Sequence, residues 1–222
     1  VKKYDEEPYR LSLSIILKKF LNDYYDIESI INDLSLVLNS LDKHRGTKKE
    51  IKKLSLLIES LRVGGFVTAE MDIREDSAIT TNAAKEIISK IYDESISISD
   101  AINLIDKNNN FDLNNLELND ASREVINTFE TVKSIRKKYG ASSINTWIVA
   151  MTGSSDDLSS IAFLTLLTKT VESKKVLPSF RIVPLLETID DLKNAKEILR
   201  NFWTQIYDQG SLVEVMIGYS DS

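Results

Sequence analysis

The sequence contains very few of the residues that interrupt helices. Among its 222 residues there are only seven Gly and three Pro, whereas these two types make up roughly 12% of an average protein. An all-β protein needs turn residues every few positions, so this shortage argues against that class. With 42% hydrophobic residues, the composition favours a helix-rich globular protein that buries a substantial core.

Charge and hydropathy narrow the possible partners. The chain has 28 Lys and Arg against 34 Asp and Glu, a net charge of −6. Its one short basic run, at residues 48–53, is typical of the solvent-facing side of a helix, so we expect no nucleic-acid partner. No apolar run approaches the roughly 20 residues of a membrane span, and no signal peptide is visible. The absence of Cys fits a reducing compartment, and we expect a cytoplasmic protein.

The first part of the chain has the apolar spacing of helices. Apolar residues recur three and four positions apart over residues 13–24, 27–41 and 51–61, and Pro8 suits a first helical turn. Three successive amphipathic helices should pack on one another or on a neighbouring layer. We therefore expect residues 1–62 to form a helical layer.

The rest of the chain, residues 63–222, alternates strand-like and helical segments. The predicted strands are residues 66–74, 144–151, 180–186 and 213–219. Helices are predicted over residues 82–92, 121–139, 158–167 and 190–207, and the Asn-rich residues 106–120 should form a loop. This alternation predicts an α/β fold, predominantly helical, whose parallel strands form either an open sheet or a barrel.

Polar residues follow these strands, where parallel α/β proteins collect their reactive groups. They occupy residues 72–76, 151–157, 187–188 and 220–222. Glu187 and Asp221 each come directly after, or close behind, an apolar strand. If the two strands are neighbours, these carboxylates converge and could hold a hard divalent cation such as Mg²⁺ or Mn²⁺.

Each of these residues also has a purely structural interpretation. Acidic residues that follow strands often cap helices, and Glu187, Asp190 and Asp156 all precede one. Arg74 could be a surface ion-pair partner rather than a clamp for a phosphate group. The lone His44 lies in a charged stretch with no clustered partner, which predicts a solvated side chain.

Other catalytic and cofactor motifs are absent from the sequence. There is no Ser/His/Asp set, Cys nucleophile, phosphate-binding loop or dinucleotide glycine fingerprint. Trp147 and Trp203 are expected to be core residues rather than stacking platforms.

The segments around the third and fourth predicted strands carry a specific resemblance. Residues 182–192 (IVPLLETIDDL) and 214–222 (EVMIGYSDS) strongly resemble phosphoenolpyruvate carboxylase of the bacterial and plant type. Three further segments agree in order: residues 7–10 (EPYR), residues 71–77 (MDIREDS), and residues 147–151 (WIVAM) together with Asp157. The resemblance thus extends over residues 7–222.

This resemblance implies a fold, a reaction and a set of site residues. The fold would be part of a (β/α)₈ TIM-type barrel with additional surrounding helices. The reaction would be the Mg²⁺- or Mn²⁺-dependent carboxylation of phosphoenolpyruvate with bicarbonate to oxaloacetate and phosphate. Glu187 and Asp221 match the family's metal ligands, and Arg74 matches an arginine near the substrate phosphate. The family also implies a homotetramer.

Departures from the family pattern matter as much as the matches. Both of the family's catalytic His residues are missing, one expected before Val1 and the other in a glycine-rich segment after Ser222, where a Lys is also expected. Asp156 and Asp157 stand where the family has Ser-Asp. We therefore expect an internal fragment of the catalytic barrel domain, inactive by itself.

Two other functions stay open on the sequence alone. One is a non-catalytic helical scaffold or interaction protein derived from this family. The other is a different metal-dependent barrel enzyme that acts on an enolate. An adjoining sequence with the expected Lys and glycine-rich segment would favour the carboxylase.

Overall fold

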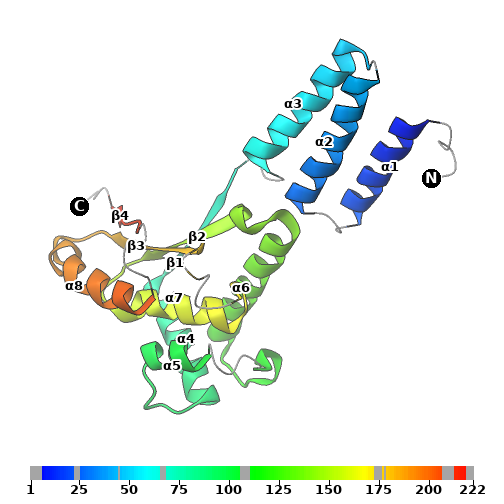
Figure 1. Ribbon diagram of the computed structural model, residues 1–222. Coiled ribbons are helices and arrows are strands. Elements are labelled where there is room, and N and C mark those ends of the chain that lie inside the picture. Colours follow the sequence, from blue (N-terminus) through cyan, green and yellow to red (C-terminus); the bar gives the residue numbers. More distant parts are fainter. Residues whose placement is uncertain are drawn as a thin grey trace. The chain divides into compact units, whose positions relative to one another are not determined.

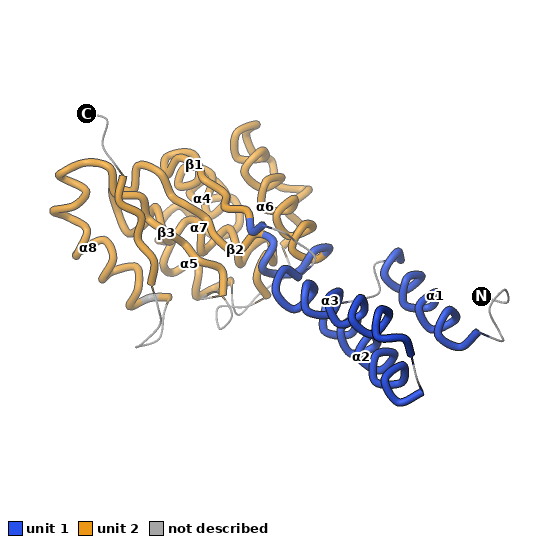
Figure 2. The backbone as a smooth tube through the Cα atoms, turned by 90° about the horizontal axis from the view of Figure 1, so that it is seen from above, with its two compact units in different colours: residues 1–70, 138–143 blue, residues 71–137, 144–222 orange. Residues whose placement is uncertain are grey.

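The computed structural model describes residues 7–22, 26–44, 46–65, 69–105, 111–172, 177, 179–206 and 213–218. The chain divides into two compact units (Figure 2), which are described separately below. Unit 1 comprises residues 1–70 and 138–143, and unit 2 comprises residues 71–137 and 144–222. The predicted domain division into residues 1–62 and 63–222 stays a prediction.

Unit 1 is built mainly from three helices: α1 (Pro8–Leu21), α2 (Ile27–Lys43) and α3 (Lys48–Gly64). Local signals explain where they begin. Pro8 lies in the first turn of α1, and the Asp26 carboxylate accepts a hydrogen bond from the backbone N–H of Ser29 at the start of α2. Thr47 and Glu50 form a reciprocal capping box at the start of α3.

The helices of unit 1 pack on one another, which was one of the two arrangements expected. Ile30 and Leu34 of α2 and Ile58 of α3 form the buried centre of a small apolar cluster. The basic run at residues 48–53 lies in α3, and its four lysines are exposed to solvent, as predicted.

Unit 2 contains a four-stranded parallel sheet in the order β1-β2-β3-β4. The strands are β1 (Met71–Asp76), β2 (Ile144–Ala150), β3 (Arg181–Leu186) and β4 (Met216–Ile217). The parallel α/β arrangement is therefore confirmed.

The limits of the first strand were predicted wrongly. Residues 69 and 70 lie outside the strand, residues 66–68 lie outside the described part of the chain, and β1 continues to Asp76. Apolar alternation did not indicate residues 75 and 76, because their place in the strand comes from pairing with Val149 and Ala150 of β2.

Unit 2 also contains α4 (Ser77–Ile91), α5 (Ile98–Ile105), most of α6 (Asp120–Tyr139), α7 (Ser155–Leu167) and α8 (Ile189–Ile206), with a short 3₁₀ turn at Leu113–Asn115. The last two residues of α6 and the 3₁₀ turn at Ala141–Ser143 belong to unit 1. Helix α4 begins five residues before its predicted start, because the Asp76 carboxylate accepts a bond from the N–H of Ala78 and so starts the helix directly after β1. Gly140 ends α6 with a positive φ of 98°, as a C-cap glycine should.

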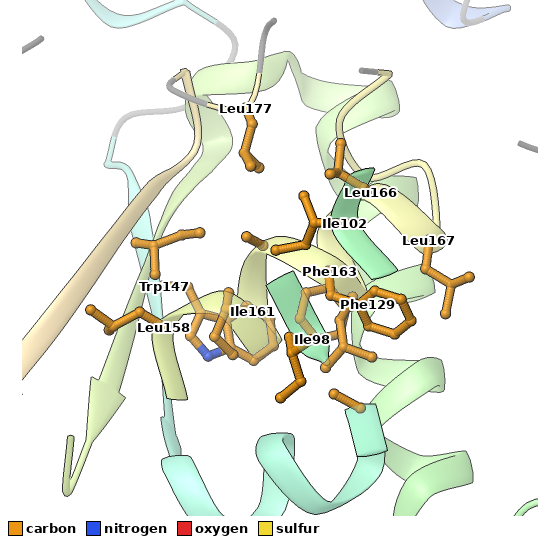
Figure 3. Packing of buried hydrophobic residues seen from close by; sticks show 14 of the residues in the cluster. Ile98, Ile102, Phe129, Trp147, Leu158, Ile161, Phe163, Leu166, Leu167 and Leu177 are labelled. Atoms are coloured by element: carbon orange, nitrogen blue, oxygen red, sulfur yellow. The ribbon is translucent and has the colours of Figure 1, made fainter. Parts of the chain in front are cut away.

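One face of the sheet is covered by helices. Helices α4, α5 and α7 lie on the same side of it (Figure 1), and α8 adds Ile198, Phe202 and Ile206 to the same core. Figure 3 shows part of this core, in which the rings of Phe129 and Trp147 stack with centroids 4.2 Å apart. Trp147 is thus a core residue, as predicted. We call this side the helix-covered face.

The opposite side of the sheet carries a different set of residues. Because successive residues of a strand point to opposite faces, Ile148 points away from the core that Trp147 and Val149 enter. Ile148, Val183 and Leu185 form a small separate buried cluster. Arg74 is in register with Ile148, so it belongs to the same side. We call this side the Arg74 face.

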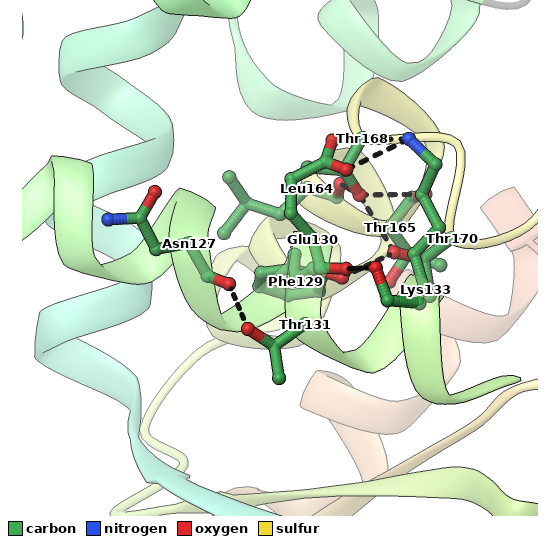
Figure 4. A network of polar contacts seen from close by, with 10 residues as sticks. Asn127, Phe129, Glu130, Thr131, Lys133, Leu164, Thr165, Thr168 and Thr170 are labelled. Carbon is green, nitrogen blue, oxygen red and sulfur yellow. Dashed lines mark hydrogen bonds and ion pairs between the residues drawn. The ribbon is translucent and has the colours of Figure 1, made fainter. Parts of the chain in front are cut away.

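Hydroxyl groups tie the end of α7 to α6 (Figure 4). The hydroxyls of Thr168 and Thr170 lie 2.8 Å apart, and Thr170 donates to the backbone carbonyl of Phe129. Between them, Lys169 has a positive φ of 56°, and the N–H of Thr170 bonds to the carbonyl of Thr165. This is the left-handed ending of a helix that glycine usually provides.

Within the described residues, no helix combines the length and the apolar character needed to cross a membrane.

Candidate functional site

The carboxyl ends of the parallel strands bring together two of the predicted site residues. Arg74 in β1 donates from a guanidinium nitrogen to Glu187 Oε1, which follows β3, over 3.1 Å. The two residues are 113 positions apart in the sequence. The side chain of Arg74 is 57% exposed and that of Glu187 is 31% exposed. The pair is therefore within reach of a dissolved ligand.

The strand order explains how this pair forms. β2 lies between β1 and β3, so the Arg74 side chain has to cross β2 to reach Glu187. Arg74 is in register with Ile148, which is in register with Val183 of β3. Two residues beyond Ile148, the same face of β2 carries Ala150, whose short side chain leaves room for a long one to pass.

Helix caps at this edge are made by other residues than those proposed from the sequence. Asp157 accepts bonds from the N–H groups of Gly153 and Ser154, and Asp191 accepts from those of Glu187 and Thr188. Asp76 caps α4, as described above. The helix caps are therefore Asp157 and Asp191. The sequence had suggested Asp156, Glu187 and Asp190 for this role.

The carboxylates around the start of α8 differ in whether their oxygens already have partners, and so in whether they could bind a ligand. The Asp190 carboxylate pairs with Lys193 over 3.0 Å and is highly exposed. Hydrogen bonds from the backbone N–H of Thr188 hold the pKa of Asp191 below its ordinary value. Glu187, by contrast, makes no capping bond with its side chain, and no described residue bonds to its Oε2 atom.

The capped helices also limit how an anion could bind here. N–H groups at the starts of α4, α7 and α8 already point to carboxylates of the chain itself. Helix N-termini are otherwise ready-made anion sites. Arg74 is placed to supply a side-chain cation to a phosphate group at this edge.

Met151, directly after β2, is a feature that the sequence analysis did not find. Its φ is 57°, in the left-handed region that residues other than Gly rarely adopt. The hydroxyl of Ser77 donates to the Met151 carbonyl over 2.8 Å, and the Met151 side chain is 58% exposed. Among residues other than Gly, positive φ is commonest at Asn and Asp, so the sequence gives no local signal for it at a Met.

The second predicted metal ligand, Asp221, lies outside the described residues. Within the part of the chain that the structure describes, no three His, Cys, Asp or Glu side chains cluster as a metal site would require. Arg74 and Glu187 are thus brought together, while the place of Asp221 stays a prediction. His44 is exposed, and its Nδ1 lies 2.9 Å from the carbonyl oxygen of Ser40.

The fold and this edge define an α/β protein of parallel strands with a charged pair at their carboxyl ends. Comparison with known families specifies it further: the model of the phosphoenolpyruvate carboxylase family matches residues 2–222. The chain belongs to the phosphoenolpyruvate carboxylase family.

Individual relatives are similar at a low level of identity. The phosphoenolpyruvate carboxylase of Synechococcus sp. is 26% identical over 266 residues, which cover 99% of this chain and 25% of the relative. That of Gloeobacter violaceus is 25% identical over 260 residues, with 99% and 27% covered. That of Burkholderia mallei is 27% identical over 219 residues, with 90% and 22% covered. The chain spans about a quarter of the length of the curated relatives it matches.

Proposed function

We propose that the chain contributes to a phosphoenolpyruvate carboxylase, which converts phosphoenolpyruvate and bicarbonate to oxaloacetate and phosphate. The observation that carries this proposal is the contact of Arg74 with Glu187 at the carboxyl edge of a parallel sheet. Both residues match motifs of the family, and neither is used as a helix cap. The four strands, in sequential order, would form part of a (β/α)₈ barrel whose interior is the Arg74 face.

Glu187 and Asp221 would hold a Mg²⁺ or Mn²⁺ ion. Carboxylate oxygens are the ligands these hard cations prefer. The fit is supported at Glu187, since Oε1 meets Arg74 while Oε2 bonds to no described residue. When bound, the ion would supply a Lewis acid for the negative charge that develops on the enolate oxygen.

Arg74 would meet the charge of the phosphoryl group. When bicarbonate attacks phosphorus, negative charge spreads over the phosphoryl oxygens, and a planar guanidinium pairs with two such oxygens at once. The Glu187 carboxylate would hold that guanidinium in place over β2. The N–H groups of Ala78, Ser154 and Thr188 at this edge already donate to the chain's own aspartates, and Lys193 pairs with Asp190, which leaves Arg74 as the cation beside Glu187.

Binding of Mn²⁺ tests the metal site directly. Titration of the chain with Mn²⁺, followed by electron paramagnetic resonance, should show one site that Glu187→Gln weakens at least ten-fold. The matched control is Asp190→Asn, which removes a carboxylate three residues away that pairs only with Lys193 among the described residues. Equal binding by wild type and Glu187→Gln would count against the assignment.

Catalysis by the 222-residue chain alone is not expected. Its single His is His44, and neither catalytic His of the family has a counterpart in its motif context. An assay for oxaloacetate with phosphoenolpyruvate, bicarbonate and Mg²⁺ should stay at background. Oxaloacetate formation by the purified chain would contradict this expectation.

A further inference from the structure

Gly218, directly after β4, lies so close to Glu187 that a side chain on residue 218 would make an unusually tight contact with it. A Cβ atom built on Gly218 would lie 3.0 Å from Glu187 Cγ and 3.3 Å from Glu187 Cα. The N–H of Gly218 donates to the carbonyl of Leu186 over 2.8 Å. The backbone of residue 218 is thus fixed against the residue that ends β3 and the carboxylate that follows it.

The conflict with a side chain is one of space and not of backbone conformation. Among the described residues, Gly65 and Gly140 are the glycines with positive φ, so the backbone of Gly218 is one that alanine can adopt. Sliding β4 away would break the bond from Gly218 to Leu186. Glu187 Cα is fixed by the preceding strand, which leaves Glu187 Cγ as the atom that must move.

We propose that Gly218 is a positioning residue for Glu187. With hydrogen in place of a side chain, residue 218 lets the Glu187 side chain take the rotamer that meets Arg74. A larger residue forces Glu187 Cγ to move by a few tenths of an ångström, which shifts the carboxylate relative to the guanidinium. Site groups need placement to within about 0.5 Å, which is similar to the shift that such a contact forces. The consequence for metal affinity rests on the proposed function, but the placement of Glu187 does not.

The first test reads the Arg74–Glu187 pair without any metal. The test follows two nuclear magnetic resonance signals, that of the Glu187 carboxyl carbon and that of the Arg74 Nε–H. Each signal is identified by its loss in the variant Glu187→Gln or Arg74→Lys. Gly218→Ala should shift both signals. The matched control is Gly153→Ala, also at this edge of the sheet, where the new Cβ meets only Asp157 Oδ2 at 4.0 Å and should leave both signals unchanged. Unchanged signals in Gly218→Ala overturn the proposal.

A double-mutant cycle covers the case in which Gly218→Ala folds poorly. Glu187→Ala removes the Cγ atom, so it should relieve the conflict. The shift in urea midpoint caused by Gly218→Ala should therefore fall to less than half in the Glu187→Ala background. An equal shift in both backgrounds, or failure to fold in both, overturns the proposal.

Metal affinity extends the test to function. Removal of a group that orients a metal ligand typically costs 10- to 100-fold in affinity, so Gly218→Ala should weaken Mn²⁺ binding at least ten-fold, and Gly153→Ala should not. Wild-type affinity in Gly218→Ala would overturn the positioning role. If the wild type binds no Mn²⁺, the proposed function fails instead, and the spectra and the unfolding cycle still decide the role of Gly218.

Discussion

The two faces of the sheet in unit 2 differ in what their side chains do. On the helix-covered face, Trp147 and Val149 enter a large apolar core together with residues of five helices. On the Arg74 face, the buried cluster has three members among the described residues, and its carboxyl end carries an exposed ion pair. The same strands thus supply alternate residues to a core and to a candidate site.

This difference shows how stability and chemistry are separated along one strand. Burial of apolar surface is the main favourable term in folding, and it is concentrated on the helix-covered face. Exposed ion pairs contribute little to the free energy of folding. The exposed charged residues of the Arg74 face can therefore serve ligand binding with little loss of stability. Three predictions test this separation, from the largest expected effect to the smallest.

Ile161→Ala should destabilise the protein most. Ile161 lies in α7, is fully buried in the core of Figure 3, and leaves a cavity when it is truncated. We expect a loss of about 2–5 kcal/mol in the free energy of unfolding, measured by urea denaturation. Ile189→Ala is the matched control, because Ile189 in α8 is 73% exposed and should cost under about 1 kcal/mol. Similar losses in both variants would contradict the contrast between core and surface.

Glu86→Gln should give a smaller, pH-dependent loss of stability where α4 contacts the start of α6. Glu86 in α4 accepts bonds from Asn119 and from the hydroxyl of Ser122 at the start of α6. The bond from Ser122 is the main cause that lowers the pKa of Glu86 from its ordinary value near 4.5. A carboxyl whose pKa is lowered by folding stabilises the protein above its unfolded pKa, and loses that effect as the pH falls through its folded pKa.

Unfolding of wild type and Glu86→Gln should therefore be compared between pH 7 and pH 3. The variant should be less stable at pH 7, and the difference should shrink below about pH 4.5. Lys85→Gln, next to it on an exposed position, is the control and should show no such change. A difference that stays constant down to pH 3 would rule out this role of the carboxylate.

Arg74→Gln should have the smallest effect on stability. The Arg74 guanidinium is more than half exposed, and exposed ion pairs contribute about 0–1 kcal/mol. Arg136→Gln is the matched control: Arg136 donates to the carbonyl of Ile144 and lies over the ring of Phe180 at 5.2 Å, and burial lowers its pKa. Urea denaturation should show a clearly larger loss for Arg136→Gln. If Arg74→Gln lost more unfolding free energy than Arg136→Gln, the Arg74–Glu187 pair would be a main contributor to stability, contrary to the contrast between the two faces.

Much of the fold could be predicted from local patterns. The alternation of strand-like and helical segments predicted four parallel strands, and the spacing of apolar residues located most helices. Strand ends were less accurate, and α5 was not predicted. In that helix, only eight residues carry the pattern, although Ser97 and Asp100 bond to each other as a start signal. From the sequence, Arg74 and Glu187 were identified as separate candidate residues, but their ion pair was not predicted.

The sequence by itself determined the family, the parallel α/β class, and the presence of Arg74 near the end of the first strand and of Glu187 directly after the third. These are local or periodic properties, which a chain carries in its order of residues. Only the tertiary structure decided that Glu187 meets Arg74 instead of capping α8, since three strands had to be placed in register first. It also decided that Gly218 lies against Glu187, because that contact depends on how β4 pairs with β3.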